Sequence, residues 1–167
     1  ALVRALKEFP NFNASLDVNS SKITYKKYFH IGFAVDTPHG LMVPKIRNVN
    51  EMSIQKIGEE LKKTSKLCRE LKIDKKEFFG GSMTISSLGG IGGTHFTPII
   101  NPPEVAILGV GKNFDRLVKE NGKIVSRKIL PISLSYDHRI IDGAEGARFC
   151  VYLGKCLGKD FAFKLAV

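Results

Sequence analysis

The sequence predicts an α+β fold, in which helices pack on a mixed β-sheet as a two-layer sandwich. Short β-rich runs outnumber the helical patterns, and the two kinds of element follow one another in mixed order. The 167 residues are 43% hydrophobic and 25% charged, the composition of an ordinary globular protein. A chain of this length can bury one substantial core, so a single domain is expected.

The first part of the chain combines a short helix with several strands. Residues 1–9 have helical spacing without a capping residue, and Pro10 ends them. A Thr-Pro-His-Gly turn at 37–40 predicts a hairpin between the two runs that flank it. Together the strands suggest an antiparallel meander. The β-rich runs are 13–17, 22–27, 28–36 and 41–46.

A longer helix and a short helical turn are predicted next. Ser53 can cap a helix that runs to about Leu71, with apolar residues at helical spacing on the face that packs. Asp74 and Glu77 have capping-box spacing and predict a short turn of helix before Gly80. The apolar positions of the longer helix are Ile54, Ile57, Leu61, Cys68 and Leu71.

A strand at 82–87 leads into a glycine-rich loop at 88–95. The loop has neither the Gly-Lys-Ser/Thr ending of a phosphate loop nor GxGxxG spacing before a helix. Its glycines therefore indicate tight turns and close backbone approach at the mouth of a site, rather than a nucleotide cradle.

Four further strands are expected in the second half. Residues 105–110 are almost uniformly apolar and predict a central strand, while the Asn-Gly pair at 121–122 predicts a tight hairpin between 114–119 and 123–127. The apolar run at 129–134 predicts another buried strand. It leads directly into the most distinctive stretch of the chain.

That stretch is a charged turn centred on His138. Asp142 and Glu145 have the spacing of a capping box, opening a helix that runs to about Gly158 with Phe149 towards the core. An imidazole changes charge near neutral pH, so a histidine held between a strand and a capped helix is the leading candidate general base. A structural histidine bonded to the backbone is the alternative, and helix capping is the alternative role of Asp142.

Ser86 and Ser87 are candidate hydroxyl donors because they end a strand beside the glycine loop. Gly-x-Ser-x-Gly is absent, which disfavours a serine hydrolase. The other histidines are dispersed, no His-Glu-x-x-His pattern occurs, and the three cysteines lack CxxC spacing, so no metal site is predicted. A base and a hydroxyl without a protein nucleophile suit a reaction in which the substrate brings its own nucleophile.

The formal net charge of +10 is compatible with a polyanionic partner. The lysines between 62 and 76 alternate with glutamates, as on a solvated helix face, and no zinc-finger or RNP motif accompanies them. No nucleic-acid partner is therefore expected. No membrane partner is expected either, because there is no apolar run of spanning length and no signal peptide.

Several blocks of the sequence resemble the dihydrolipoamide acyltransferases, the core components of the 2-oxo acid dehydrogenase complexes. Residues 133–143, Ser-Leu-Ser-Tyr-Asp-His-Arg-Ile-Ile-Asp-Gly, are similar to the His-x-x-x-Asp-Gly signature of that family. The Gly-Ser-Met-Thr-Ile-Ser-Ser-Leu-Gly block at 81–89 is similar to a second family block. The resemblance continues in register through 6–17, 40–44, 94–98 and 103–109.

The resemblance implies a chloramphenicol-acetyltransferase-like fold and acyl transfer between dihydrolipoamide and coenzyme A. By position, His138 is implied as general base, Ser86 as oxyanion donor, and Asp142 as the motif aspartate, with a structural role as its alternative. It also implies a homotrimer with sites at subunit interfaces, the histidine and serine of one site coming from different subunits. The trimer is expected to join a larger multimeric core, with decarboxylase and dihydrolipoamide dehydrogenase components as partners and no metal.

The Thr-Ile-Ser-Ser and Gly-Leu-Met-Val-Pro segments closely resemble those of the pyruvate dehydrogenase subfamily, and this resemblance implies an acetyl donor. A branched-chain or succinyl donor is the near alternative, and a non-catalytic core subunit is the alternative of another class. Residues 1–167 are expected to be an acyltransferase catalytic domain lacking its N-terminal part, with the lipoyl and subunit-binding domains absent. The apolar tail at 160–167 is expected to be buried by the domain or a neighbouring subunit. The expected location is the bacterial cytoplasm, with the mitochondrial matrix as the alternative.

Overall fold

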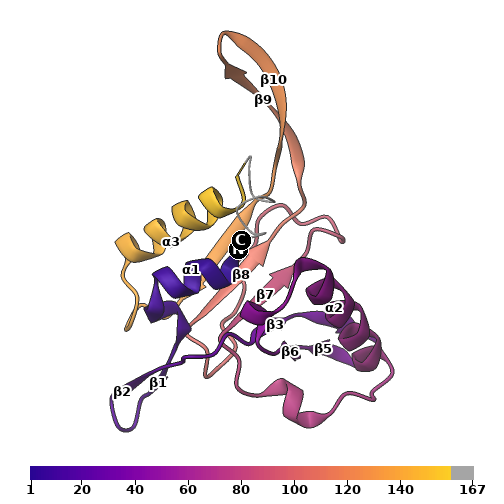
Figure 1. Cartoon of the computed structure of the whole chain (residues 1–167), viewed down its shortest axis with the longest axis vertical. Coiled ribbons are helices and arrows are strands. Elements are labelled where there is room, and N and C mark those ends of the chain that lie inside the picture. Colours follow the sequence, from indigo (N-terminus) through magenta and orange to yellow (C-terminus); the bar gives the residue numbers. More distant parts are fainter. Residues whose placement is uncertain (159–167) are drawn as a thin grey trace.

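A five-stranded mixed sheet in the order β11-β8-β7-β3-β6 organises the computed structural model, which describes residues 1–158 (Figure 1). Strand β7 lies at its centre and pairs in parallel with both β3 and β8, whereas β11–β8 and β3–β6 are antiparallel. The sheet is therefore mixed, as predicted. Its strands are β3 (Ile31–Phe33), β6 (Lys45–Ile46), β7 (Met83–Ser87), β8 (Ala106–Val110) and β11 (Ile132–Tyr136).

Three separate antiparallel hairpins surround this sheet, and the one formed by β9 and β10 projects furthest from it (Figure 1). Asn121 and Gly122 at its tip have φ values of 50° and 80°, the left-handed pair that a tight two-residue hairpin turn requires. The hairpins predicted at the 37–40 and 121–122 turns are confirmed. The strands of the three hairpins are β1 (Ala14–Asp17) with β2 (Lys22–Tyr25), β4 (Val35–Thr37) with β5 (Gly40–Met42), and β9 (Phe114–Glu120) with β10 (Lys123–Ile129).

The antiparallel meander expected from the first half of the chain is not formed. The predicted run 28–36 divides at Ala34, whose N–H donates to the carbonyl oxygen of Ile85 at 3.0 Å. As a result β3 joins the central sheet while β4 leaves it to pair with β5. The central sheet is built instead by strands distant in sequence.

Of the three helices in the described part of the chain, two begin with the predicted caps. The N–H of Lys56 donates to Ser53 Oγ at 3.2 Å, and the N–H of Glu145 donates to Asp142 Oδ1 at 2.7 Å. The helices are α1 (Leu2–Glu8), α2 (Ile54–Arg69) and α3 (Gly143–Cys156), with short 3-10 turns at Pro10–Asn13, Val49–Glu51 and Lys75–Phe78.

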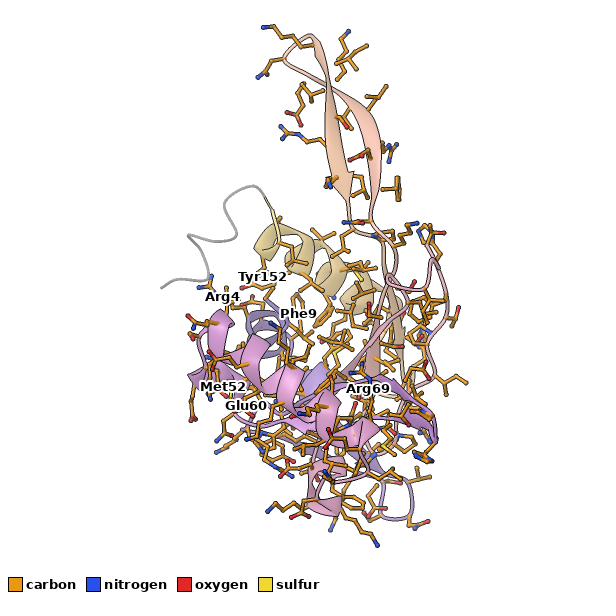
Figure 2. All side chains as sticks on the ribbon, turned by 90° about the vertical axis from the view of Figure 1, so that its right-hand side faces the viewer. Arg4, Phe9, Met52, Glu60, Arg69 and Tyr152 are labelled. Carbon is orange, nitrogen blue, oxygen red and sulfur yellow. The ribbon has the colours of Figure 1, made fainter. Side chains whose placement is uncertain are left out.

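The two faces of the sheet differ because alternate residues of a strand point to opposite sides. On β7, Met83 and Ile85 face the main hydrophobic core, into which α1 and α3 pack. Phe9 of the α1 end lies beside Tyr152 of α3, their ring centroids 5.8 Å apart (Figure 2). Thr84 and Ser86 point to the other face and line a cleft there, and no helix of residues 1–158 contributes to its lining.

Two packing expectations are wrong. Ile54, Leu61 and Leu71, predicted to pack from the long helix, are 59%, 42% and 54% exposed, and only Cys68 of that set is fully buried. The strand leading to His138, predicted as buried, is the edge strand β11 and is half-buried throughout. Sequence periodicity marks an apolar face but does not reveal which element covers it. The predicted burial of the tail at 160–167 concerns a segment outside the described residues.

Candidate active site

Ser86 lies near the end of β7 and lines a cleft of about 390 Å³. The backbone at this level is held on both sides, since Ser86 pairs with Gly109 of β8 and the neighbouring Ile85 binds the N–H of Ala34. The Phe96 ring lies close against Gly109, where any added Cβ would come within 3.0 Å of it. Gly109 therefore lets the wall of the cleft approach the sheet.

The cleft around the Ser86 hydroxyl is mainly apolar. Hydrogen bonds to a developing negative charge are stronger in such surroundings than in water. Leu41 and Ile99 also line the cleft and are largely exposed, so the cleft is open to solvent. Its other apolar side chains include Val43, Leu88, Phe96, Pro98, Ile100 and Ile107.

His138 lies in the exposed turn that follows β11. Its ring lies 5.7 Å from that of Tyr136, and no hydrogen bond joins its imidazole to another group of residues 1–158. The next residue, Arg139, donates to Asp137 Oδ2 at 2.6 Å through its guanidinium, and this hydrogen bond is the main reason that the pKa of Asp137 lies below its usual value. The imidazole is thus presented outward on a turn that its neighbours hold in shape.

The turn is anchored to the body by its backbone and by one apolar side chain. The N–H of Asp137 donates to the carbonyl oxygen of Val105 at 2.8 Å, which continues the β11–β8 ladder by one residue. Ile141 is fully buried in the core. These contacts leave His138 exposed while the residues on both sides are fixed.

Asp142 caps α3 and does not hydrogen-bond to His138. Only half of the predicted capping box is formed, because the carboxylate of Glu145 accepts two hydrogen bonds from the Asn11 amide, at 3.1 and 3.0 Å. The hydroxyl of Tyr25 donates to Asn11 Oδ1 at 3.1 Å. Asn11 therefore ties the first hairpin to the helix that follows the His138 turn, a contact across 134 positions that no local pattern could reveal.

Ser86 and His138 are not brought together within one chain. Ser86 pairs with Gly109 of β8, whereas the His138 turn meets β8 at its other end, just before Ala106. Four positions along this strand, from Gly109 to Val105, separate the two levels, on the order of 13 Å. A single site that uses both side chains needs a second copy of the chain.

The other histidines and the cysteines show no sign of a metal centre. His30 stacks on Tyr28 with centroids 4.3 Å apart, and its Nδ1 accepts the N–H of Asn48 at 3.0 Å. Burial, and secondly the charge of Arg47, lower the pKa of His30. Within residues 1–158, no group of three or more histidines, cysteines or acidic residues is placed to hold a metal ion. Nor does that part of the chain contain a helix long and apolar enough to cross a membrane.

Comparison with known proteins identifies the family. Residues 1–162 match the family model described as 2-oxoacid dehydrogenases acyltransferase (catalytic domain). The chain belongs to this acyltransferase family. It is 52% identical over 161 residues to the dihydrolipoyllysine-residue acetyltransferase component of the pyruvate dehydrogenase complex of Cupriavidus necator, covering 96% of this chain and 29% of that protein. The counterpart from Haemophilus influenzae is also 52% identical, over 157 residues, with 94% and 28% covered. The chain thus spans less than a third of the length of these relatives.

Solved structures of this acyltransferase family have the same fold. The dihydrolipoamide acetyltransferase of Azotobacter vinelandii matches with a TM-score of 0.92 and 50% identity, over 98% of this chain and 68% of that one. The cubic core of a pyruvate dehydrogenase multienzyme complex matches with a TM-score of 0.92 and 49% identity, with the same coverage. Chloramphenicol acetyltransferase, at 15% identity and a TM-score of 0.52, covers 89% of this chain and 70% of its own. The predicted fold is confirmed.

Proposed function

We propose that this acyltransferase domain transfers an acetyl group from acetyl-dihydrolipoamide to coenzyme A. The spacing of three residues carries the proposal. In the Azotobacter vinelandii acetyltransferase, the serine and histidine whose roles in the catalytic mechanism were investigated lie 52 positions apart, and the third such residue, an asparagine, lies four positions after the histidine. Ser86 and His138 have the same separation, and Asp142 occupies the third position.

His138 acts as the general base on the thiol of coenzyme A. A thiol with a pKa near 8.5 is only a few per cent ionised at neutral pH, so a base at the sulfur increases the supply of nucleophile. The sulfur forms a bond to the thioester carbonyl carbon while its proton passes to the imidazole. The bond from that carbon to the dihydrolipoamide sulfur then breaks, and the departing thiolate takes the proton back.

Ser86 stabilises the oxyanion of the tetrahedral intermediate. Its hydroxyl stands on a rigid interior strand beside an apolar cleft, so its orientation changes little as charge develops on the carbonyl oxygen. Removing one such donor typically lowers turnover by a factor of roughly 10² to 10³. Asp142 supports the turn by capping α3 and takes no direct part.

The domain works as a homotrimer in which His138 of one subunit faces Ser86 of the next. Support comes from the offset of about 13 Å along the sheet between the level of Ser86 and the level of the His138 turn, too far for them to serve one reacting thioester in the same chain. Likeness to a cubic core supports assembly of trimers into a larger core.

The remaining partners follow from the named relatives, which are bacterial components of pyruvate dehydrogenase complexes. We propose that the acetyl group arrives on a lipoyl group carried by another domain of the protein. The decarboxylase and dihydrolipoamide dehydrogenase components are the proposed partner enzymes, and the bacterial cytoplasm is the proposed location.

Mixing two inactive variants tests the shared site. Because the chain covers only 68% of the solved Azotobacter vinelandii acetyltransferase, the assay uses it within a catalytic domain of that full length. His138→Ala and Ser86→Ala chains are co-expressed in equal amounts and assembled together. If each site takes one residue from each of two neighbours in a trimer, random mixing restores about a quarter of the sites. Recovery of no activity, with mixed trimers present, would refute the shared site.

Competition between acyl donors tests the acetyl assignment. Acetyl-, isobutyryl- and succinyl-dihydrolipoamide are supplied together, and the acyl-coenzyme A products are quantified by mass spectrometry. Acetyl-coenzyme A should dominate, and faster transfer of a larger group contradicts the acetyl assignment. Trimers that assemble fully but transfer none of the three groups would favour the alternative of a non-catalytic core subunit.

A further inference from the structure

An ion pair is buried beneath the Ser86 cleft. Lys45 Nζ of β6 lies 2.5 Å from Glu104 Oε1, and both side chains are only 1% exposed. The hydroxyl of Thr84 on β7 completes the group, donating to Glu104 Oε2 at 2.6 Å and accepting from Lys45 Nζ at 3.3 Å. Three separate parts of the chain therefore meet in one hydrogen-bonded network.

Two glycines make room for this network. A Cβ on Gly32 of β3 would come within 2.5 Å of Thr84 Oγ1, and one on Gly81 would come within 2.2 Å of Glu104 Oε1. The free energy needed to remove two charges from water can exceed the free energy gained from their attraction. Well-packed apolar residues often replace such a pair without loss of stability. A gain in stability is therefore a poor explanation for this buried ion pair, which also requires glycine at two neighbouring positions.

The geometry of β7 suggests another role. Thr84 and Ser86 are two residues apart on one strand, so their side chains share a face, and both line the same cleft. The Thr84 hydroxyl uses its only proton on Glu104, so it is not a donor for substrate. A slip of β7 by one residue would move both side chains to the helix-covered face, and it would also break the bonds to Glu104 and Lys45.

We propose that Thr84, held by the Glu104–Lys45 ion pair, is a positioning residue for the Ser86 hydroxyl. Its hydrogen bonds lock the register and the local twist of β7, and so set the direction in which Ser86 points into the cleft. This inference rests on the proposed oxyanion role of Ser86. It adds a directional constraint that apolar packing at the same place could not supply.

Replacing the hydroxyl by a methyl group tests the proposal in the full-length catalytic domain. Thr84→Val keeps the shape of the side chain but leaves Glu104 Oε2 without its donor. We expect kcat to fall about 10-fold to 100-fold, the cost of a small misplacement of a reacting group, while KM for both substrates changes little. Thr84→Ser, which restores the hydroxyl, should recover most of the lost turnover. Thr24→Val, the same change on an exposed position of β2, serves as the control and should keep the parent kcat.

A merely structural role gives a different result in mixed assemblies. Thr84→Val is placed either on the His138→Ala chain, which contributes Ser86, or on the Ser86→Ala chain, which contributes His138. A positioning role predicts that the recovered activity falls only in the first mixture. An equal fall in both mixtures, or full turnover of Thr84→Val at temperatures where it is folded, overturns the proposal. If Ser86→Ala alone retained full turnover, the proposed function itself would fail instead.

Discussion

Ser86 and His138 stand on supports of opposite kinds. Ser86 belongs to β7, the central strand of the sheet, with a paired strand on each side. Thr84, two residues earlier on the same strand, is hydrogen-bonded to the buried Lys45–Glu104 ion pair. His138 belongs to an exposed turn after the edge strand β11, and its imidazole makes only a ring contact with Tyr136 among the described residues. One half of the site is rigid within the chain, while the other is presented outward.

This difference fits their proposed tasks. A group that stabilises developing charge is most effective when it does not reorganise, so an interior strand suits Ser86. A general base must reach the thiol of a second substrate and exchange a proton with it, so an outward imidazole suits His138. The contrast also predicts that substitutions can affect turnover and stability separately. Changes to the His138 side chain should lower turnover alone, whereas changes to the residues that support its turn should lower stability as well.

The largest expected effect is that of His138→Ala on turnover. Loss of the general base should lower kcat by a factor of about 10² to 10⁴. The melting temperature should hardly change, because the side chain is exposed and has no hydrogen bond to residues 1–158. Steady-state kinetics and thermal unfolding measure the two quantities. His39→Ala, another exposed histidine in the β4–β5 turn, is the control and should retain activity.

Ser86→Ala should have the next largest effect, a fall in kcat of roughly 10²-fold to 10³-fold with a smaller change in KM. The matched control is Ser87→Ala, since the adjacent side chain is exposed and points to the opposite face of β7. Single-turnover kinetics separate the chemical step from product release. Equal losses for the two variants would show that the strand end, and not the cleft-facing hydroxyl, matters.

Gly146→Ala tests the support of the His138 turn. A Cβ there would lie 2.8 Å from the Tyr136 ring, and overpacking of this kind costs about 1–3 kcal/mol in the free energy of unfolding. Because Tyr136 contacts the His138 ring, kcat should fall as well. Gly154→Ala, in the same helix with nothing within 4 Å of its Cβ, should instead stabilise the protein by about 0.5–1 kcal/mol. Denaturant unfolding of both variants provides the comparison.

Asp142 variants should have the smallest effect and separate its two possible roles. Asp142→Ala removes the cap of α3 and should cost about 1 kcal/mol of stability. Asp142→Asn keeps a side chain that caps helices equally well, so its stability and kcat should stay near those of the parent. A large loss of kcat in Asp142→Asn at unchanged melting temperature would instead assign the carboxylate a direct influence on His138.

Local patterns predicted the pieces of this fold well. The caps at Ser53 and Asp142, the Asn-Gly hairpin and the apolar strand that became β8 all depend on residues close together in sequence. The likeness of several blocks to an acyltransferase family indicated the candidate residues. Burial was predicted less well for Ile54 and Leu61, because exposure depends on which distant elements lie opposite.

The sequence by itself determined the identity of the candidate groups and the local turns that carry them, since capping, turn chemistry and strand periodicity act over a few residues. Only the tertiary structure decided that β7 is central and β11 is at the edge, that Asn11 binds Glu145, and that an ion pair lies below Ser86. It also placed Ser86 and His138 at opposite ends of one sheet. Strand order and register join residues far apart in the chain, and no local rule specifies them.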